Sequence, residues 1–340
     1  MTTTPNALLL LAAAISAIFP LALAGRAPKG NSMPPVLLVA NQDDRNLSFI
    51  DPASAKQVAT VDETGITGHE VAASPDGRTA YVPIYGDSVV GKQGLDGHTV
   101  DVIDIASRRI ISTVDFGHGV RPHCVIFEPV SGMLYVTTEV DRSVTIIDPK
   151  TLKIAGSIPT GQAESHMLAI SHDGRRGYTA NVGPGTVSVL DMNARKTIAI
   201  IPIATKTQRI SISNDDTMVF TADQTKPQLA VIDTSTNQIR NWIALPAIGY
   251  GTALTKDGRW LLVAVPSLNK VAVVDMSSLE VVRTTDVGRR PSEILVRPDG
   301  LIAYVSCVGS HEVDAIDLTQ WKVQAAIQAG EGSDGLAWAQ

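Results

Sequence analysis

The amino-acid sequence predicts an all-β fold, a seven-bladed β-propeller with four-stranded blades, from three observations. A short apolar strand that ends in aspartate recurs seven times along the chain. The last three intervals between copies are 42 residues each, a length typical of one propeller blade. Turns that contain Asp-Gly lie upstream of several copies, and Asp-Gly supplies the positive φ angles of a tight hairpin.

The recurring strand alternates apolar side chains with a period of two, as a sheet strand does. Its seven copies end at Asp51, Asp104, Asp148, Asp191, Asp233, Asp275 and Asp317. A second short strand follows each copy, as in residues 196–201. A strand pair joined by a turn, as at Ser171–Gly174, lies upstream of most copies. Each repeat therefore supplies the four strands of one blade.

The innermost strands also predict how the ring closes. They are expected to begin at one position of the repeat, occupied by His69, His123, His166, Gln208, Tyr250, Ser292 and Asp334. No such strand begins at Ala27, one repeat before His69. We therefore expect residues 334–340 to complete the first blade by pairing with residues 35–41, which leaves no free sheet edge at the closure.

Short tyrosine-containing strands recur as Tyr135–Thr138, Tyr178–Asn181 and Tyr304–Ser306, beside Pro-Asp-Gly turns and the Val-x-Val-Ile-Asp strand. With these motifs the chain resembles the YVTN or YncE-like β-propeller repeat family over nearly its whole length after the N-terminal segment. The resemblance implies the same fold. It also implies a range of functions, from surface-layer proteins and binding modules to lactonases and lyases, so it does not assign one.

The N-terminal residues have the pattern of an export signal. Residues 7–23 are almost all apolar, and Ala22–Ala24 supplies a small-x-small cleavage site. We expect a signal peptide at 1–24, a linker at 25–34 and the propeller at 35–340, in a secreted or periplasmic protein. The first six residues carry no Lys or Arg, so a retained membrane anchor stays open as the alternative.

Composition narrows the partners. The formal charge of −6 and the absence of a basic stripe argue against a nucleic-acid partner. No later segment is long and apolar enough to form a transmembrane helix after signal removal. Two cysteines, Cys124 and Cys307, are too few for a disulfide framework and are expected to be buried free thiols. We expect a monomer that binds a small-molecule ligand.

Three histidines suggest a metal site. His69, His123 and His166 occupy the same repeat position on three successive blades, and Asp334 occupies it on the blade before them. Equivalent positions lie around the channel, and three imidazoles with one carboxylate suit a divalent Zn, Fe, Mn or Cu ion. The competing interpretation is a polar channel lining that only binds water.

The next repeat position supplies candidate catalytic groups. Glu70 and Glu293 are candidates for proton transfer, and Arg209 with Tyr250 for orienting the substrate. The longest interval between repeats places a Gly-rich insertion at residues 84–98. This insertion is either a lid, with Tyr85, Lys92 and His98 as contacts, or a tolerated surface loop.

These features lead to two hypotheses of function. The first is a site for a small oxygen-rich ligand at a His-rich channel mouth, in a metal-assisted hydrolase or lyase of the lactonase kind. The alternative is a non-catalytic binding or interaction module of the cell envelope. The sequence names neither the substrate nor the reaction.

Overall fold

The computed structural model describes residues 1–2, 34–87 and 89–340. The compact unit spans Met33–Gln340 and contains every strand. The predicted signal peptide at 1–24 and linker at 25–34 lie almost entirely outside the described residues. Within the described residues, no helix is long and apolar enough to cross a membrane.

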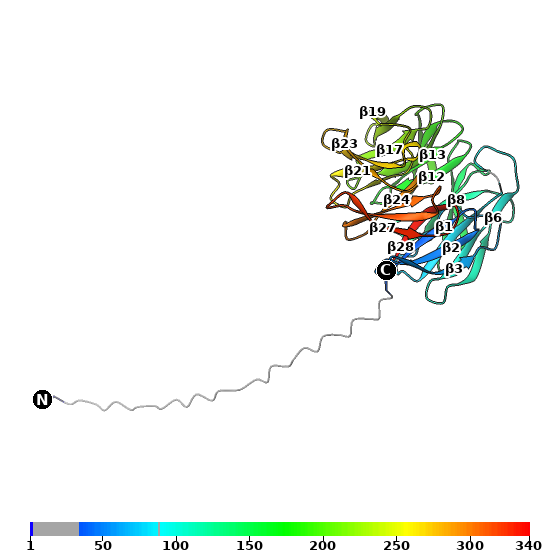
Figure 1. Ribbon diagram of the computed structural model, residues 1–340, viewed down its shortest axis with the longest axis horizontal. Helices are drawn as coiled ribbons and strands as arrows, with labels where there is room; N and C mark the ends of the chain where they lie inside the picture. The colour runs from blue at the N-terminus through cyan, green and yellow to red at the C-terminus, as the bar shows by residue number, and fades with distance from the viewer. Residues whose placement is uncertain (3–33, 88) are drawn as a thin grey trace. The chain divides into compact units, whose positions relative to one another are not determined.

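The compact unit is a seven-bladed β-propeller of seven four-stranded antiparallel sheets (Figure 1). In spatial order from the axis outward, the first three blades are β28 (Ser333–Ala339), β1 (Val36–Asn41), β2 (Asn46–Asp51) and β3 (Lys56–Asp62); β4 (Ala72–Ala73), β5 (Thr79–Gly86), β6 (Asp96–Asp104) and β7 (Arg109–Asp115); and β8 (Pro122–Phe127), β9 (Leu134–Thr138), β10 (Ser143–Asp148) and β11 (Lys153–Pro159). The predicted fold class is confirmed.

The other four blades repeat the same order. They are β12 (Ser165–Ile170), β13 (Arg176–Asn181), β14 (Thr186–Asp191) and β15 (Lys196–Pro202); β16 (Thr207–Ile212), β17 (Met218–Asp223), β18 (Gln228–Asp233) and β19 (Gln238–Ala244); β20 (Thr252–Leu254), β21 (Trp260–Val265), β22 (Lys270–Asp275) and β23 (Glu280–Asp286); and β24 (Pro291–Val296), β25 (Ile302–Cys307), β26 (Glu312–Asp317) and β27 (Lys322–Gln328). A 3-10 turn, η1 (Pro266–Leu268), follows β21.

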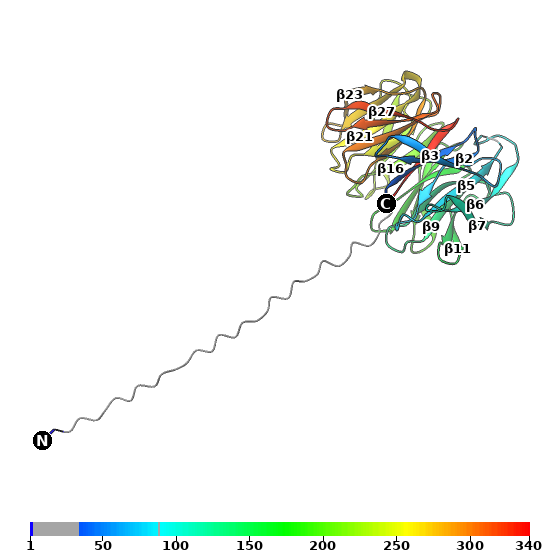
Figure 2. The ribbon, with the colours of Figure 1, turned by 60° about the horizontal axis from the view of Figure 1, so that its bottom comes forward.

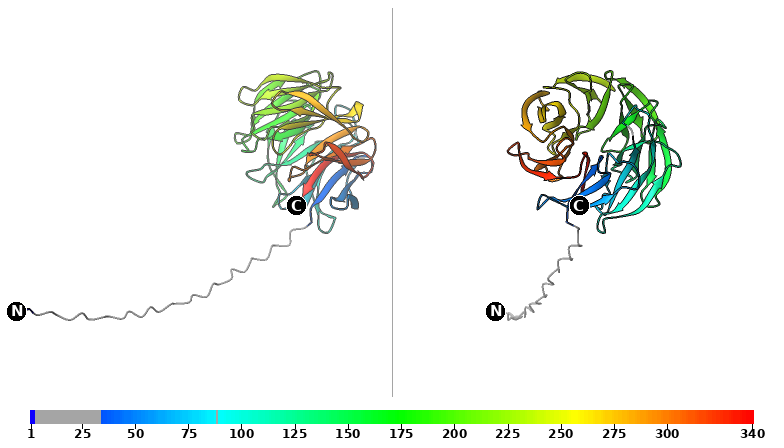
Figure 3. Two further views of the ribbon diagram at one scale, coloured as in Figure 1. Left: turned by 60° about the vertical axis from the view of Figure 1, so that its left-hand side comes forward. Right: turned by 45° about the vertical axis from the view of Figure 1, so that its right-hand side comes forward.

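The ring closes through the C-terminal strand. β28 pairs antiparallel with β1, with Val36 opposite Ala339 and Asn41 opposite Ser333. Figures 1 and 2 show the red C-terminal strand against the blue N-terminal strands, and Figure 3 shows the blades arranged around a central axis. The predicted pairing of residues 334–340 with 35–41 is confirmed. The pairing forms because β1 is the second strand of a blade whose inner strand only β28 supplies.

The recurring aspartate ends the third strand of each blade and stabilises the turn that follows. The Asp51 carboxylate accepts the Ala53 N–H at 3.0 Å, and Asp317 accepts the Thr319 N–H at 2.7 Å. Hydrogen bonds from the turn lower the pKa of all seven of these aspartates. The recurring aspartate is therefore a turn signal, because its carboxylate accepts a backbone N–H of the turn that no backbone carbonyl accepts.

The core lies between the blades, where the strands pack face to face. Its buried side chains are mostly Val, Ile, Leu and Ala, with a tyrosine or phenylalanine on several second strands such as Tyr178 and Phe220. Cys124 in β8 and Cys307 in β25 are buried free thiols, as predicted. This rigid ring fixes the positions of the inner-strand residues that face the channel.

Candidate functional site

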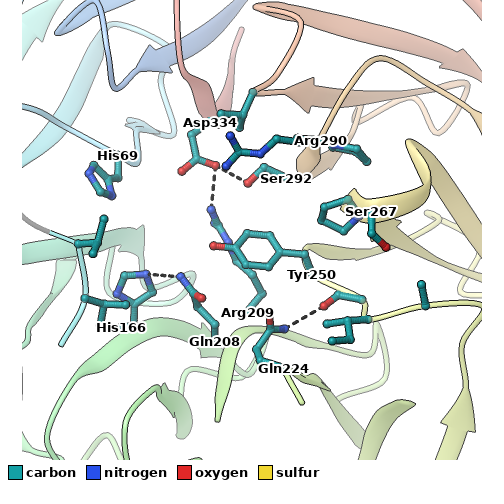
Figure 4. Close-up of a pocket in the computed structure, with 18 of the residues that line it drawn as sticks. His69, His166, Gln208, Arg209, Gln224, Tyr250, Ser267, Arg290, Ser292 and Asp334 are labelled. Carbon is teal, nitrogen blue, oxygen red and sulfur yellow. Dashed lines mark hydrogen bonds and ion pairs between the residues drawn. The ribbon is translucent and has the colours of Figure 1, made fainter. Parts of the chain in front are cut away.

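One cavity of about 800 Å³ occupies a mouth of the central channel. All seven residues that open the inner strands line it: Asp334, His69, His123, His166, Gln208, Tyr250 and Ser292. They come from seven blades because each inner strand begins at this end of the channel (Figure 4). The structure therefore brings together the complete set of residues that the repeat position selects.

The three imidazoles pack ring against ring. The centroids of His123 and His166 are 3.5 Å apart with their planes tilted by 31°, and His69 meets His123 edge-on at 5.2 Å. Burial lowers the pKa of His69 to about 4, against the attraction of Asp334, and lowers the pKa of His123 well below its usual range. Both rings are therefore neutral at pH 7.

Asp334 is held by donors from its own blade and from two others. Its Oδ1 accepts hydrogen bonds from Arg209 Nη2 at 2.9 Å and from Ser292 Oγ at 2.5 Å, and its Oδ2 accepts one from the amide of Gln42. The Asp334 carboxylate thus accepts hydrogen bonds from three side chains at the floor of the cavity.

The expected metal site at His69, His123, His166 and Asp334 is not assembled in this arrangement. Among the described residues, no group of three or more His, Cys, Asp or Glu side chains is placed to hold a metal ion. The physical reason is that His123 and His166 turn their ring faces toward each other, while His69 meets His123 edge-on. The carboxylate, for its part, already has three donors.

Arg209 closes the floor of the cavity. Its guanidinium pairs with Glu70 Oε1 at 2.5 Å and Asp334 Oδ1 at 2.9 Å, and it lies 5.2 Å from the centre of the Tyr250 ring. Burial opposes its charge, but these carboxylates keep its pKa well above the usual value. Arg209 is 3% exposed, so this ion pair spans the channel in a nearly dry environment.

Glu70 and Glu293 do not line the cavity. Burial raises the pKa of both, and the two carboxyls also interact with each other across the floor. Glu293 Oε2 accepts the Leu336 N–H at 2.9 Å. Arg209 lies in the floor beside them, and their proton-transfer roles stay predictions. Arg209 and Tyr250 do line the cavity, as predicted.

The sequence analysis missed Glu139, which orients His166. Its carboxylate accepts the Tyr85 hydroxyl at 2.8 Å and the Nδ1–H of His166, and it is 4% exposed. The amide of Gln208 lies 3.1 Å from His166 Nε2. These partners place a hydrogen on Nδ1, toward Glu139, and make Nε2 the acceptor of the Gln208 amide.

A second repeat position contributes to the wall. Gln42, Gln224, Pro266 and Val308 each directly follow a second strand, and all four line the cavity. Glu139 occupies the same position after β9. The alignment that selected the inner-strand openers would also have selected this ring, one residue past each second strand on the same face.

The insertion after β5 has a mixed role. Tyr85 is fully buried and stacks on His69 at 4.7 Å, so it supports a lining residue without lining the cavity itself. Lys92 and His98 are exposed and do not line the cavity; His98 pairs with Asp115 at 2.9 Å. Val89 and Val90, which the sequence did not single out, line it instead.

The cavity wall contains two buried nitrogen atoms without a partner among the described residues, His123 Nδ1 and Arg209 Nε. An unpaired buried polar atom costs about 1–3 kcal/mol. Opposite the histidines, the wall is apolar and is built from Pro227, Pro246, Ala247, Ile248, Pro266, Pro291 and Val308. The cavity therefore has a polar half with unmet hydrogen-bonding capacity and an apolar half.

Comparison with known proteins gives distant relatives. A family model described as the cytochrome D1 heme domain matches residues 130–250. Antigen Lp49 of Leptospira interrogans is 22% identical over 241 residues, covering 64% of this chain and 52% of that protein. The uncharacterized protein YncE of Salmonella typhimurium is 22% identical over 192 residues, covering 55% and 54%. The chain spans about half the length of these curated relatives.

Solved structures agree on the fold. Hydrazine synthase of Kuenenia stuttgartiensis matches with a TM-score of 0.72 at 18% identity, over 87% of this chain and 98% of that chain. A functionally unknown protein from Desulfotomaculum acetoxidans matches with a TM-score of 0.74 at 14% identity, over 90% and 99%. At these sequence identities the structural similarity supports the propeller fold and says nothing about the activity of this chain.

Proposed function

We propose that this chain, a YncE-like seven-bladed β-propeller, binds a small oxygen-bearing organic ligand in the cavity at its channel mouth. One observation carries the proposal. The seven inner-strand openers line a single cavity whose wall leaves His123 Nδ1 and Arg209 Nε unpaired. A ligand oxygen that accepts from Arg209 Nε would satisfy a donor that the protein itself does not.

The cavity has the size and composition of a small-molecule site. Its volume of about 800 Å³ is within the range of ligand pockets, and its few polar groups converge from several blades while the opposite wall is apolar. Arg209, Glu70 and Asp334 fix the floor by ion pairs. A ligand would therefore meet a preformed surface, which lowers the entropic cost of binding.

Haem, suggested by the description of the matched family model, does not fit these donors. The charged groups of the lining are two guanidiniums and one carboxylate, and Arg209 is already neutralised by Asp334 and Glu70. One cation is left for the several carboxylates of a haem. His123 and His166 are 1% and 3% exposed and stack on each other, which leaves little room for iron at either ring. The proposed ligand is not a haem.

Binding is tested by a thermal-shift screen of small carboxylic acids, hydroxy acids, sugars and lactones, followed by calorimetry on each compound that raises Tm. Gln208→Leu removes an amide from the cavity wall and is expected to weaken binding about tenfold. Arg175→Gln, an exposed residue in the β12–β13 turn at the far end of that blade's inner strand, is the control. Compounds that bind both variants equally well would place the site elsewhere.

A second candidate function, hydrolysis or elimination, is favoured by Glu139. A carboxylate that accepts His166 Nδ1–H leaves the ring's lone pair on Nε2, which faces the Gln208 amide at 3.1 Å. A bound molecule or water that displaces this amide would transfer its proton to Nε2, and Glu139 would stabilise the imidazolium that forms. Any compound from the screen can be assayed for turnover. Catalysis of this kind requires loss of turnover in His166→Gln with retained binding, whereas a non-catalytic binding module gives no turnover in either form.

We also propose that the chain is exported. The apolar residues 7–23 and the small residues at 22–24 support this, and they lie outside the described residues. Fractionation of cells that express the full chain tests it, with a chain that begins at Gly25 as the control. A full chain that stays uncleaved in the cytosol would contradict export.

A further inference from the structure

The charged groups of the cavity leave one cation free. Arg209 pairs with Asp334 and Glu70, whereas Arg290 forms no ion pair with any described carboxylate. An unpaired guanidinium beside a cavity attracts an anionic group.

The backbone holds Arg290 at the mouth. Its N–H donates to Asn269 Oδ1 at 3.1 Å, and its carbonyl accepts the Val308 N–H at 3.1 Å. Its φ is 55°, in the left-handed region where glycine would be favoured. The backbone of Arg290 is therefore fixed at the mouth, and its exposed side chain extends from that point.

The wall next to Arg290 is apolar. Pro291 follows it directly, Val308 follows β25 of the same blade, and Pro266 follows β21 of the preceding blade. Ile248 is 37% exposed at the same mouth. Figure 4 shows Arg290 and Ser267 on this side of the cavity, across from His69 and His166. A ligand whose anionic group binds Arg290 would lay its remaining atoms against this surface.

We propose that the cavity binds a small organic anion with a single carboxylate- or sulfonate-type group and an apolar body. The anionic group lies on Arg290, and the apolar body packs against Pro266, Pro291 and Ile248. This inference rests on the proposed binding function and names its ligand class. One free cation matches one negative charge, which separates this class from polyanions and from neutral sugars.

The test uses two fluorescent probes of similar shape. 1-Anilinonaphthalene-8-sulfonate carries one sulfonate, and N-phenyl-1-naphthylamine is its uncharged counterpart. Fluorescence titration of the full chain is expected to give at least tenfold tighter binding of the sulfonate. Arg290→Gln should abolish that preference. Arg289→Gln should keep it, because the adjacent Arg289 does not line the cavity and its Nε donates to the Gly309 carbonyl.

Four outcomes would each contradict part of this proposal. Equal affinity of both probes for the wild type, or an unchanged preference in Arg290→Gln, would refute the anionic class while leaving a binding cavity. Failure of both probes to bind would refute the cavity as a ligand site. Binding that survives Ile248→Asp would show that the probes bind another surface, and circular dichroism checks that each variant is folded.

Discussion

Asp314 is a buried carboxyl whose ionisation should destabilise the propeller. It lies in β26, is 3% exposed, and accepts the Gly288 N–H at 2.7 Å through Oδ2, while Oδ1 has no partner. Burial raises its pKa from 3.8 to about 6, opposed by the Gly288 hydrogen bond and assisted by Glu312. At about 1.36 kcal/mol per unit, the charged form costs about 3 kcal/mol in the native state.

The sign of the pH dependence follows from these two values. Below pH 3.8 the carboxyl is protonated in both states and costs nothing extra. As pH rises through 6, the unfolded chain has already ionised while the folded chain resists, so the wild type loses stability. Of the total of about 3 kcal/mol, the wild type should lose about 2 kcal/mol of its free energy of unfolding between about pH 4.5 and 8. Asp314→Asn cannot ionise and should escape this loss.

Urea unfolding followed by tryptophan fluorescence at both pH values measures the effect. The free energy of unfolding of Asp314→Asn, relative to the wild type, should rise by about 2 kcal/mol from low to high pH. Asp101 is the matched control at the same repeat position, because Thr64 donates to both of its oxygens at 2.5 and 2.8 Å. Asp101→Asn should gain less. A pH-independent difference for Asp314→Asn would refute the reasoning.

Three further predictions concern the floor, a turn and the thiols. Arg209→Met leaves Glu70 and Asp334 unpaired and should lower the free energy of unfolding by about 3–5 kcal/mol, with partial recovery on adding Glu70→Met; no recovery would mean that lost packing dominates. Ala55→Gly should raise the free energy of unfolding by about 1 kcal/mol, and with it the urea midpoint, because Ala55 has a φ of 53°; a fall would show that its methyl packing outweighs the strain. Cys124, whose pKa burial raises to about 12, should react with Ellman's reagent only in urea, as should the buried Cys307, and rapid native labelling would contradict their burial.

The blade number and the closure were predictable because both depend on a period and not on side-chain detail. Aspartates spaced by one blade mark equivalent turns, and a missing inner strand at Ala27 requires a replacement from the other terminus. The same period placed His69 and Asp334 at one mouth. It would also have placed Gln42 and Glu139 there, had the residue after each second strand been aligned.

Side-chain partners, in contrast, are decided by contacts between blades that the period does not encode. Because they share one repeat position, His166 and Asp334 line the same cavity. Glu139, however, orients the His166 imidazole, and Arg209 binds the Asp334 carboxylate. Arg209 is one residue away from a ring position, and its guanidinium reaches across the channel to two other blades. The Arg209 side chain therefore pairs with Asp334, one of the predicted metal ligands, and with Glu70, and these ion pairs form the floor of the cavity. That leaves Arg290, outside the aligned ring, as the group that selects the charge of a ligand.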